Sequence, residues 1–240
     1  QGQAKLAAQN LATMVNHSME QEIEKAQTMA SEPLIQKMIQ KITSESIENA
    51  SVEISALDSY LSDVYQKIGE NYDSFFLSDS TGRIVADCFD GKFRQQKVNI
   101  EKREYFQSAK SGKIIISDPV ISLTSGKPIV VIAVPLKSDS NTFAGILGSV
   151  VKLTALSEKI TQVKIGETGY PFMVAKDGLF IAHPVKDYIF DLNMAKLQGM
   201  EEITKRSLAQ ESGVEKYHFK GTDKIAGFAP VESTGWSLVV

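Results

Sequence analysis

The stretch Phe76-Leu-Ser-Asp-Ser-Thr-Gly-Arg-Ile-Val-Ala-Asp87 recurs further along the chain as Phe172-Met-Val-Ala-Lys-Asp-Gly-Leu-Phe-Ile-Ala-His183. The phenylalanine, the glycine and the last alanine keep their positions in both copies. Each copy places a polar turn with a glycine between two apolar segments, and glycine tolerates the positive φ that such turns require. The stretch therefore predicts a β-hairpin that occurs twice.

Two further landmarks follow each copy in the same order. Ala133-Val-Pro-Leu136 corresponds to Ala229-Pro-Val231 around its proline, and Gly145-Ile-Leu-Gly-Ser-Val150 corresponds to Gly235-Trp-Ser-Leu-Val-Val240. The period is much longer than the roughly 20–50 residues of a solenoid repeat. We therefore expect two tandem domains of one kind.

The composition is that of an ordinary globular protein. Of the 240 residues, 42% are hydrophobic and 23% are charged, and the net charge is −3. These values exclude a disordered tail and give no reason to expect a nucleic acid partner. The longest apolar run, Ile129 to Val134, is far shorter than the roughly 20 residues of a membrane-spanning helix. The single cysteine, Cys88, excludes an internal disulfide and is expected to be a small buried hydrophobe.

Residues 1–70 are predicted to be helical. Apolar residues recur there at three- and four-residue spacing, and Ser31-Glu-Pro33 predicts a break after the first helix. Further apolar stripes start at Leu34 and Ile47 and continue to Ile68. Such a stripe fits either the seam of a coiled-coil dimer or packing against the following sheets, and both alternatives stay open. The first stripe consists of Leu11, Val15, Met19, Ile23, Ala26 and Ala30.

From Tyr72 onward the pattern predicts an antiparallel sheet of five strands, with a short helix over residues 103–110 that ends at Gly112. Residues 154–169 are expected to form a connecting helix and turn, and residues 170–240 a second, more compact sheet. The predicted fold class is α+β, with two modules on a shared helical spine that covers one face of a sheet.

This order of elements resembles the double Cache domain, the PAS-like extracellular sensor module of bacterial and archaeal chemoreceptors and histidine kinases. The resemblance covers the whole chain and implies three parts. Residues 1–70 would be the helical spine, 71–153 the membrane-distal Cache module with the ligand pocket, and 154–240 the connector helix and the membrane-proximal module. The matching motifs are Arg103-Glu-Tyr-Phe106, Ile116-Ser-Asp-Pro119, Ser125-Gly-Lys-Pro128, Ala144-Gly-Ile-Leu-Gly148 and Gly166-Glu-Thr-Gly-Tyr170.

The resemblance also implies where and how the protein acts. Both ends would continue into transmembrane helices, so the full-length receptor would be anchored in the cell membrane with this domain outside the cytoplasm. A homodimeric receptor is expected, with a small-molecule ligand, no cofactor and no metal. Binding would displace the C-terminal end near Trp236 relative to the N-terminal helix.

Arg103 is the first candidate for ligand binding. A guanidinium matches a carboxylate geometrically and stays charged in any environment. In the amino-acid receptors of the family, the corresponding arginine takes the carboxylate of the ligand, and Tyr105 and Phe106 would add aromatic walls. From the residues alone, Lys102-Arg103-Glu104 would rather indicate a solvated helix face, as charge runs usually do.

The sequence departs from the family where those receptors hold the ammonium of the ligand. The acidic positions are occupied by Val150 and Ser122, while Val120 replaces an aromatic residue and Val98 a tyrosine. A buried ammonium without a counter-charge costs roughly 3–5 kcal/mol. The pocket is therefore predicted to reject amino acids and to bind a small mono- or dicarboxylate. The predicted ligand-binding residues are Arg103, Tyr105, Phe106, Asp118, Val120, Ser122 and Val150, with Asp118 expected mainly to order a turn before Pro119.

The second module offers fewer candidates. Tyr170, His183 and Tyr217 are positioned to line a cavity, although a histidine before a proline is also typical of a turn, and the family implies that this module transmits the signal. The sequence lacks a phosphate loop, a nucleophile elbow and a histidine cluster, which argues against an enzyme. The remaining alternatives are an amino-acid or amine sensor with a divergent pocket, and a structural or dimerisation module without a ligand.

Overall fold

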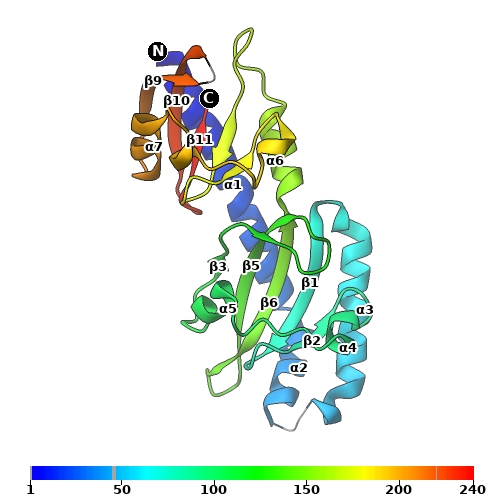
Figure 1. The fold of residues 1–240 in the computed structure, drawn as a ribbon. Coiled ribbons are helices and arrows are strands. Elements are labelled where there is room, and N and C mark those ends of the chain that lie inside the picture. Colours follow the sequence, from blue (N-terminus) through cyan, green and yellow to red (C-terminus); the bar gives the residue numbers. More distant parts are fainter. Residues whose placement is uncertain (1, 45–46, 220) are drawn as a thin grey trace. The chain divides into compact units, whose positions relative to one another are not determined.

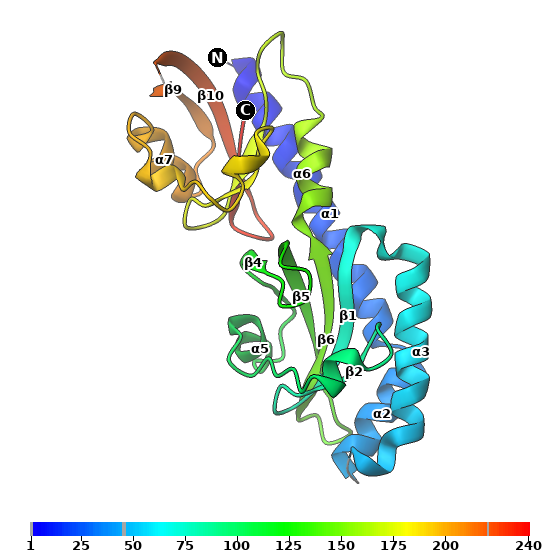
Figure 2. The same cartoon turned by 45° about the vertical axis from the view of Figure 1, so that its right-hand side comes forward.

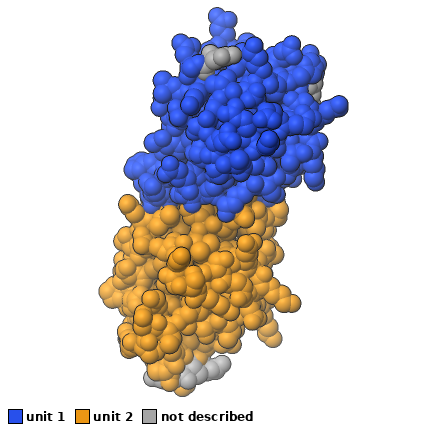
Figure 3. All heavy atoms as spheres, turned by 90° about the vertical axis from the view of Figure 1, so that its left-hand side faces the viewer, with its two compact units in different colours: residues 1–21, 153–240 blue, residues 22–152 orange. Residues whose placement is uncertain are grey.

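The computed structural model describes residues 2–44, 47–219 and 221–240, and the chain divides into two compact units (Figure 3). Unit 1 comprises residues 1–21 and 153–240, and unit 2 comprises residues 22–152. The N-terminal helices, residues 1–70, do not form a separate unit. Residues 1–21 group with the second sheet in unit 1, and residues 22–70 group with the first sheet in unit 2.

Three helices make up the N-terminal part: α1 (Gly2–Ala30), α2 (Pro33–Ser44) and α3 (Ser51–Ile68). The predicted break after Ala30 is confirmed. Pro33 occupies the first position of α2, where a missing N–H costs no helical hydrogen bond. The apolar stripe of α1 packs within the chain rather than forming an exposed seam, since Leu11, Val15, Met19, Ala26 and Ala30 are buried.

Unit 2 contains one antiparallel sheet in the order β2-β1-β6-β5-β3, in which β4 also pairs with β5 (Figure 1). The sequence pattern predicts five strands, and β4 is the additional one. It makes only two pairs with β5, too few to produce an alternating pattern in the sequence. The strands are β1 (Tyr72–Asp79), β2 (Ile84–Asp87), β3 (Ile115–Ile116), β4 (Val120–Ile121), β5 (Pro128–Lys137) and β6 (Phe143–Lys152).

Helices cover both faces of this sheet. In Figures 1 and 2, α2 and α3 lie on one side, and the short helix α5 (Glu104–Ala109) lies on the other. Helix α4 (Lys92–Gln95) follows the β1–β2 hairpin and contacts β2. The core on the α5 side contains Phe76, Ile84, Phe106, Val131 and Val150, and this face also holds the cavity described below.

Unit 1 contains the second antiparallel sheet, in the order β8-β7-β11-β10-β9. Helix α7 packs on one face, where Ile203 contacts the cluster around Phe228. The first turns of α1 pack on the other face, because Gly227 lets the backbone come so close that a Cβ atom would lie 2.1 Å from the carbonyl oxygen of Ala4. The elements are α6 (Leu153–Thr161), β7 (Phe172–Val174), β8 (Phe180–Ala182), α7 (Glu201–Leu208), β9 (Gly213–Phe219), β10 (Thr222–Val231) and β11 (Trp236–Val239). Short 3₁₀ helices cover Glu48–Ala50, Gly69–Asn71, Lys186–Tyr188 and Met194–Lys196.

The repeated hairpin is confirmed down to its register. Leu77 pairs with Ala86 in the first copy, and Met173 pairs with Ala182 in the second. Both hairpins shift register at the next residue, and both turns close on a glycine with positive φ, at 82° and 87°. The same turn chemistry therefore produces the same bulged hairpin twice.

The later landmarks match with one correction. In unit 2 the row across the sheet runs through Phe76, Gly148 and Ala133, and in unit 1 it runs through Phe172, Val239 and Phe228. The prolines of β5 and β10 are thereby equivalent, as the sequence indicated. The glycines are not equivalent, because Leu136 lies opposite Gly145 whereas Val231 lies opposite Trp236, so the second glycine precedes its strand by one residue.

Two further expectations concern single features. Cys88 is buried, as predicted, and burial raises the pKa of its thiol to about 12. Among the described residues, none of the helices has the length and apolar character needed to cross a bilayer.

Candidate ligand-binding site

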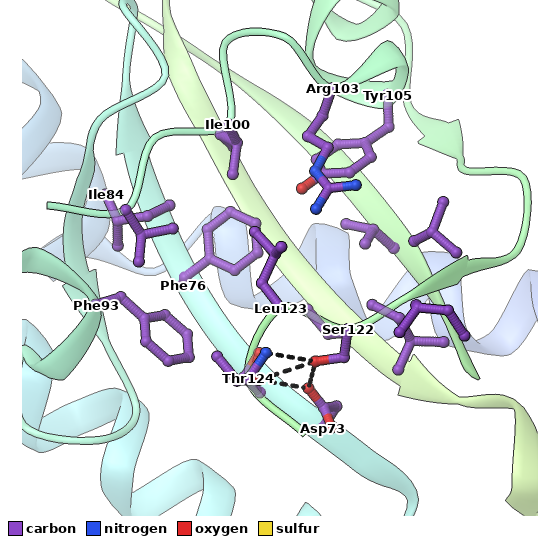
Figure 4. Close-up of a pocket in the computed structure, with 17 residues that line it drawn as sticks. Asp73, Phe76, Ile84, Phe93, Ile100, Arg103, Tyr105, Ser122, Leu123 and Thr124 are labelled. Atoms are coloured by element: carbon purple, nitrogen blue, oxygen red, sulfur yellow. Dashed lines mark hydrogen bonds between the residues drawn. The ribbon is translucent and has the colours of Figure 1, made fainter. Parts of the chain in front are cut away.

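A cavity of about 50 Å³ lies in unit 2 between the sheet and the segments that carry α5 and β4 (Figure 4). Apolar side chains form most of its wall, and the polar groups are concentrated at two places. Residues from β1, β2, β5 and β6 form the floor, and residues from α4, α5, β4 and the adjoining loops form the rest. The lining residues are Asp73, Ser74, Phe76, Ile84, Phe93, Val98, Ile100, Arg103, Tyr105, Val120, Ile121, Ser122, Leu123, Thr124, Ile129, Val131 and Val150.

Arg103 lines the cavity and comes from the residue that precedes α5. Its backbone is extended (φ −77°, ψ 134°), and its carbonyl oxygen accepts the N–H groups of Phe106 and Gln107 at 3.1 Å each. This conformation lets the side chain leave the helix axis, and Figure 4 shows the guanidinium pointing into the cavity. Within the described part of the chain, the half-buried guanidinium has no hydrogen bond and no ion pair. It is therefore available to an anionic group.

The two aromatic residues after Arg103 have different surroundings. Tyr105 lines the cavity. Burial raises the pKa of Tyr105 to about 12, against the opposing effect of the nearby Arg103 charge, so its hydroxyl stays neutral at physiological pH. Phe106 is fully buried, packs edge-on against Phe143 with ring centroids 5.6 Å apart, and is not among the cavity residues. Asp118 is exposed and also does not line the cavity.

The substituted family positions do come together. Val98, Val120, Ser122 and Val150 all line the cavity. Ser122 differs from the other three because its hydroxyl donates a hydrogen bond to a carboxylate oxygen of Asp73 at 2.7 Å. The hydroxyl thus already has a protein partner.

Asp73 is a charged cavity residue that the sequence did not reveal. Its Oδ2 also accepts a hydrogen bond from the Thr124 hydroxyl at 3.1 Å, the residue is 6% exposed, and it has no ion pair within the described residues. A β-bulge between Tyr72 and Ser74 makes it the extra residue in the pairing of β1 with β6. Bulges redirect side chains, so regular alternation along the strand does not reveal that Asp73 lines the cavity.

A buried ionic network holds the cavity wall near Phe93. Asp87 is fully buried and accepts the N–H groups of Phe89 at 3.0 Å and Phe93 at 2.9 Å. Its own N–H donates to Asp58 of α3 at 2.9 Å, and Arg94 binds Asp58 at 2.7 Å. Burial, and to a smaller extent the charge of Asp58, raises the pKa of Asp87. The network therefore fixes α4, which carries Phe93, against β2 and α3.

Comparison with known proteins identifies the family. The model of the Cache domain family matches residues 1–240. The chain belongs to the Cache domain family. The two sheets are the two modules of a double Cache domain, and the family consists of sensor domains rather than enzymes.

Curated relatives of this Cache domain are chemoreceptors. The methyl-accepting chemotaxis protein McpB of Bacillus subtilis (strain 168) is 28% identical over 139 residues, which cover 57% of this chain and 19% of McpB. The methyl-accepting chemotaxis protein PscA of Pseudomonas syringae pv. tomato is 31% identical over 83 residues, covering 34% of this chain and 13% of PscA. The chain thus spans about a fifth of the length of McpB.

Solved structures share the Cache fold. The extracellular domain of mmHK1S-Z3, described as a histidine kinase, superimposes with a TM-score of 0.73 at 20% identity, covering 99% of this chain and 92% of that one. The ligand-binding domain of Mlp24 with asparagine superimposes with a TM-score of 0.70 at 20% identity, covering 99% of this chain and 91% of that one. The ligand-binding domain of the Pseudomonas fluorescens chemoreceptor CtaA in complex with L-serine superimposes with a TM-score of 0.65 at 18% identity, covering 97% of this chain and 92% of that one.

The ionic network leads to a prediction for Arg94. Replacing Arg94 with Met keeps the aliphatic packing but leaves Asp58 and Asp87 as two buried carboxylates without their cation. Because the Arg94 side chain is 31% exposed, we expect a loss of about 2–3 kcal/mol in the free energy of unfolding at pH 7, the lower end for a broken buried pair.

The loss should shrink as the pH falls from 7 to 5. Burial raises the pKa of Asp87 in the folded state, and we expect loss of the Arg94 charge to raise it further in the variant. A carboxyl group with a raised folded-state pKa binds its proton more tightly when folded, so protonation at low pH stabilises the variant more than wild type, and this gain disappears as the pH rises. Urea denaturation at several pH values measures the effect. Arg83→Met is the control, because Arg83 is 51% exposed and should cost less than about 1 kcal/mol. A deficit that is independent of pH would contradict the prediction.

Proposed function

We propose that this Cache domain is the extracytoplasmic ligand-binding domain of a transmembrane signalling receptor, and that its ligand binds through a carboxylate in the cavity of unit 2. The observation that carries the proposal is Arg103. Its guanidinium enters an apolar cavity without an anionic partner among the described residues. A charge-assisted, bidentate hydrogen bond to a carboxylate would satisfy it.

The opposite end of the cavity supports a ligand that also carries an amine. In Figure 4, Arg103 approaches from one end, while Asp73 lies at the other with Ser122 and Thr124. The Asp73 carboxylate accepts two hydroxyl hydrogen bonds and has no ion pair among the described residues, although Lys92, Lys127 and Lys152 line a neighbouring hollow with it. A buried charge without a partner is costly, and a ligand ammonium would supply that partner. A small zwitterion such as an α-amino acid therefore uses both ends, and Mlp24 and CtaA were solved with amino acids.

A carboxylate without an amine is the second candidate. It is favoured by Val98 and Val150, which put apolar walls where amino-acid receptors of the family carry a tyrosine and an acid. Both candidates share the contact with Arg103 and differ only at Asp73. The cavity of about 50 Å³ is small beside the roughly 300 Å³ of ordinary ligand sites. Either ligand would therefore displace part of the cavity wall. We expect the loop around Leu123 to move, because Leu123 is 66% exposed and its displacement breaks few packing contacts.

Arg103→Ala should abolish binding of every carboxylate ligand. The test is a thermal-shift screen of α-amino acids, each beside the acid that lacks the amine and the amine that lacks the carboxylate. A ligand at a hundredfold its Kd adds about 2.7 kcal/mol of stability, which is several degrees in a chain of this size. Lys102→Ala, an exposed neighbour, is the matched control. A carboxylate that stabilises Arg103→Ala as much as wild type would overturn the assignment.

Asp73→Asn should separate the two ligand classes. Asparagine keeps the size and an acceptor for the Ser122 hydroxyl but loses the charge. If the ligand is an amino acid, we expect affinity to fall at least about tenfold, as for one lost charge-assisted contact, while acids without an amine bind as well as before or better. Titration calorimetry of both variants measures this. Unchanged amino-acid affinity would exclude Asp73 as the ammonium partner and leave the carboxylate candidate.

Signalling is proposed to proceed by a small displacement of the chain ends. Val150 of the cavity wall lies on β6, and β6 continues into α6 without an intervening residue. Binding that moves this strand would therefore act directly on the connector helix. A ligand shifts the equilibrium only if it prefers one state, and couplings of about 1–3 kcal/mol are usual.

The expected displacement is on the order of an ångström between the first turns of α1 and the turn before β11. Spin labels at the exposed positions Lys5 and Glu232 report this distance by pulsed electron resonance. Ligand should shift it in the wild-type chain and not in Arg103→Ala. Identical distances with and without saturating ligand would rule out this mechanism.

A further inference from the structure

Unit 1 reproduces the framework that surrounds the cavity of unit 2. After each hairpin, an asparagine side chain accepts the N–H group two residues ahead: Asn99 from Glu101 at 2.7 Å, and Asn193 from Ala195 at 2.9 Å. Both asparagines also form a bridge to the residue after the turn glycine. The loop that enters the cavity side of unit 2 thus has a counterpart in unit 1.

Strand pairing identifies the residues of unit 1 that stand in cavity positions. Lys224 lies on β10, four residues before Phe228, and its cross-strand partner is Tyr217. Tyr170 precedes β7 by two residues and packs against the core cluster of unit 1. The equivalent residues in unit 2 are Ile129, its partner Val120, and Ser74, and all three line the cavity there.

Lys224 of unit 1 occupies the strand position that Ile129 has in unit 2. It therefore places a cation on this face of the second sheet. The Lys224 ammonium donates a hydrogen bond to the Tyr170 hydroxyl at 2.7 Å and lies 4.9 Å from the centre of the Tyr170 ring and 5.9 Å from that of Phe219. Among the residues that the structure describes, none of the carboxylates forms an ion pair with it, and the neighbouring Asp223 pairs with His218 at 2.8 Å. A half-buried ammonium with two further protons to donate is available to an anion.

Tyr217 adds a second hydroxyl, and the group is accessible. Burial, with a smaller contribution from Tyr170, raises the pKa of Tyr217 to about 12, so its phenol remains a neutral donor at physiological pH. A hollow of about 560 Å³ borders the β9–β10 hairpin and includes Tyr217 and Lys224 in its lining. The other ionisable side chains that line this hollow are Lys216, His218 and Asp223.

We propose that unit 1 holds a second ligand site, in which the Lys224 ammonium and the hydroxyls of Tyr170 and Tyr217 bind the carboxylate of a small monocarboxylic acid. Aromatic rings around the ammonium favour a ligand with an apolar body over a strongly hydrated ion such as phosphate. The site is separate from the cavity of unit 2, where the corresponding strand position is apolar and the cation comes from Arg103.

The test is a titration of the 240-residue chain with propionate, followed by amide chemical shifts. We expect saturable shifts at Tyr170, Tyr217 and Lys224 in the wild-type chain, and none with propylamine, which matches propionate in size but is a cation. In Lys224→Met, which keeps the aliphatic stem, binding should weaken at least about tenfold. Tyr170→Phe, which removes only one hydroxyl, should weaken it less.

Lys205→Met is the matched control, since Lys205 is exposed on α7 and does not line the hollow, so it should leave the titration unchanged. Absence of saturable shifts at these three amides, or equal binding by Lys224→Met, would overturn the proposal. Arg103→Ala separates it from the proposed function, because that variant should lose shifts around the cavity of unit 2 and retain those around Lys224.

Discussion

The pairing of β1 with β6 is the interaction on which unit 2 depends. The two strands are far apart in sequence, so their pairing closes a long loop and must be stabilised by burial on both faces of the sheet. On the cavity face, Phe76 lies over Gly148, where a Cβ atom would stand 2.2 Å from the ring. The glycine thus allows Phe76 to form the floor of the cavity. At the end of the same pairing, the bulge after Tyr72 directs Asp73 toward the cavity.

The same pairing relates the cavity to the rest of the chain. Because β6 lies in the middle of the sheet and continues into α6, the strand that forms part of the cavity wall is also the strand that leaves the unit. A sheet interior is close-packed and does not deform gradually. A change at the cavity wall is therefore more readily accommodated by movement of the strand with its helix than by local compression.

The elements that the sequence predicted are those determined by local chemistry. The repeated hairpin depends on a turn glycine and neighbouring apolar residues, and the helices depend on periodic spacing and Pro33. Features that depend on distant partners were not predictable: β4, the Asp58–Arg94 pair between separate helices, and the bulge at Asp73. Phe106 illustrates a different limit. Adjacent residues on a helix point about 100° apart, so Tyr105 and Phe106 do not share the cavity, although the sequence analysis assigned both to it.

The two modules show how one framework supports different chemistry. Arg103 donates its N–H to the carbonyl oxygen of Ile100 at 2.9 Å, and Leu197 makes the equivalent bond to Met194 at 3.2 Å. The backbone is therefore the same where unit 2 carries a cation and unit 1 an apolar residue. On the facing strand the cation is in unit 1 and the apolar residue in unit 2, since Lys224 occupies the position that Ile129 has in unit 2. Each module thus places a cation at or next to the cavity positions on this side of its sheet, from a loop in unit 2 and from a strand in unit 1. Moving the charge between these positions changes the approach of an anion without altering the turns, the capping asparagines or the strand register. The fold consequently constrains where a ligand binds, while a few side chains determine which ligand it is.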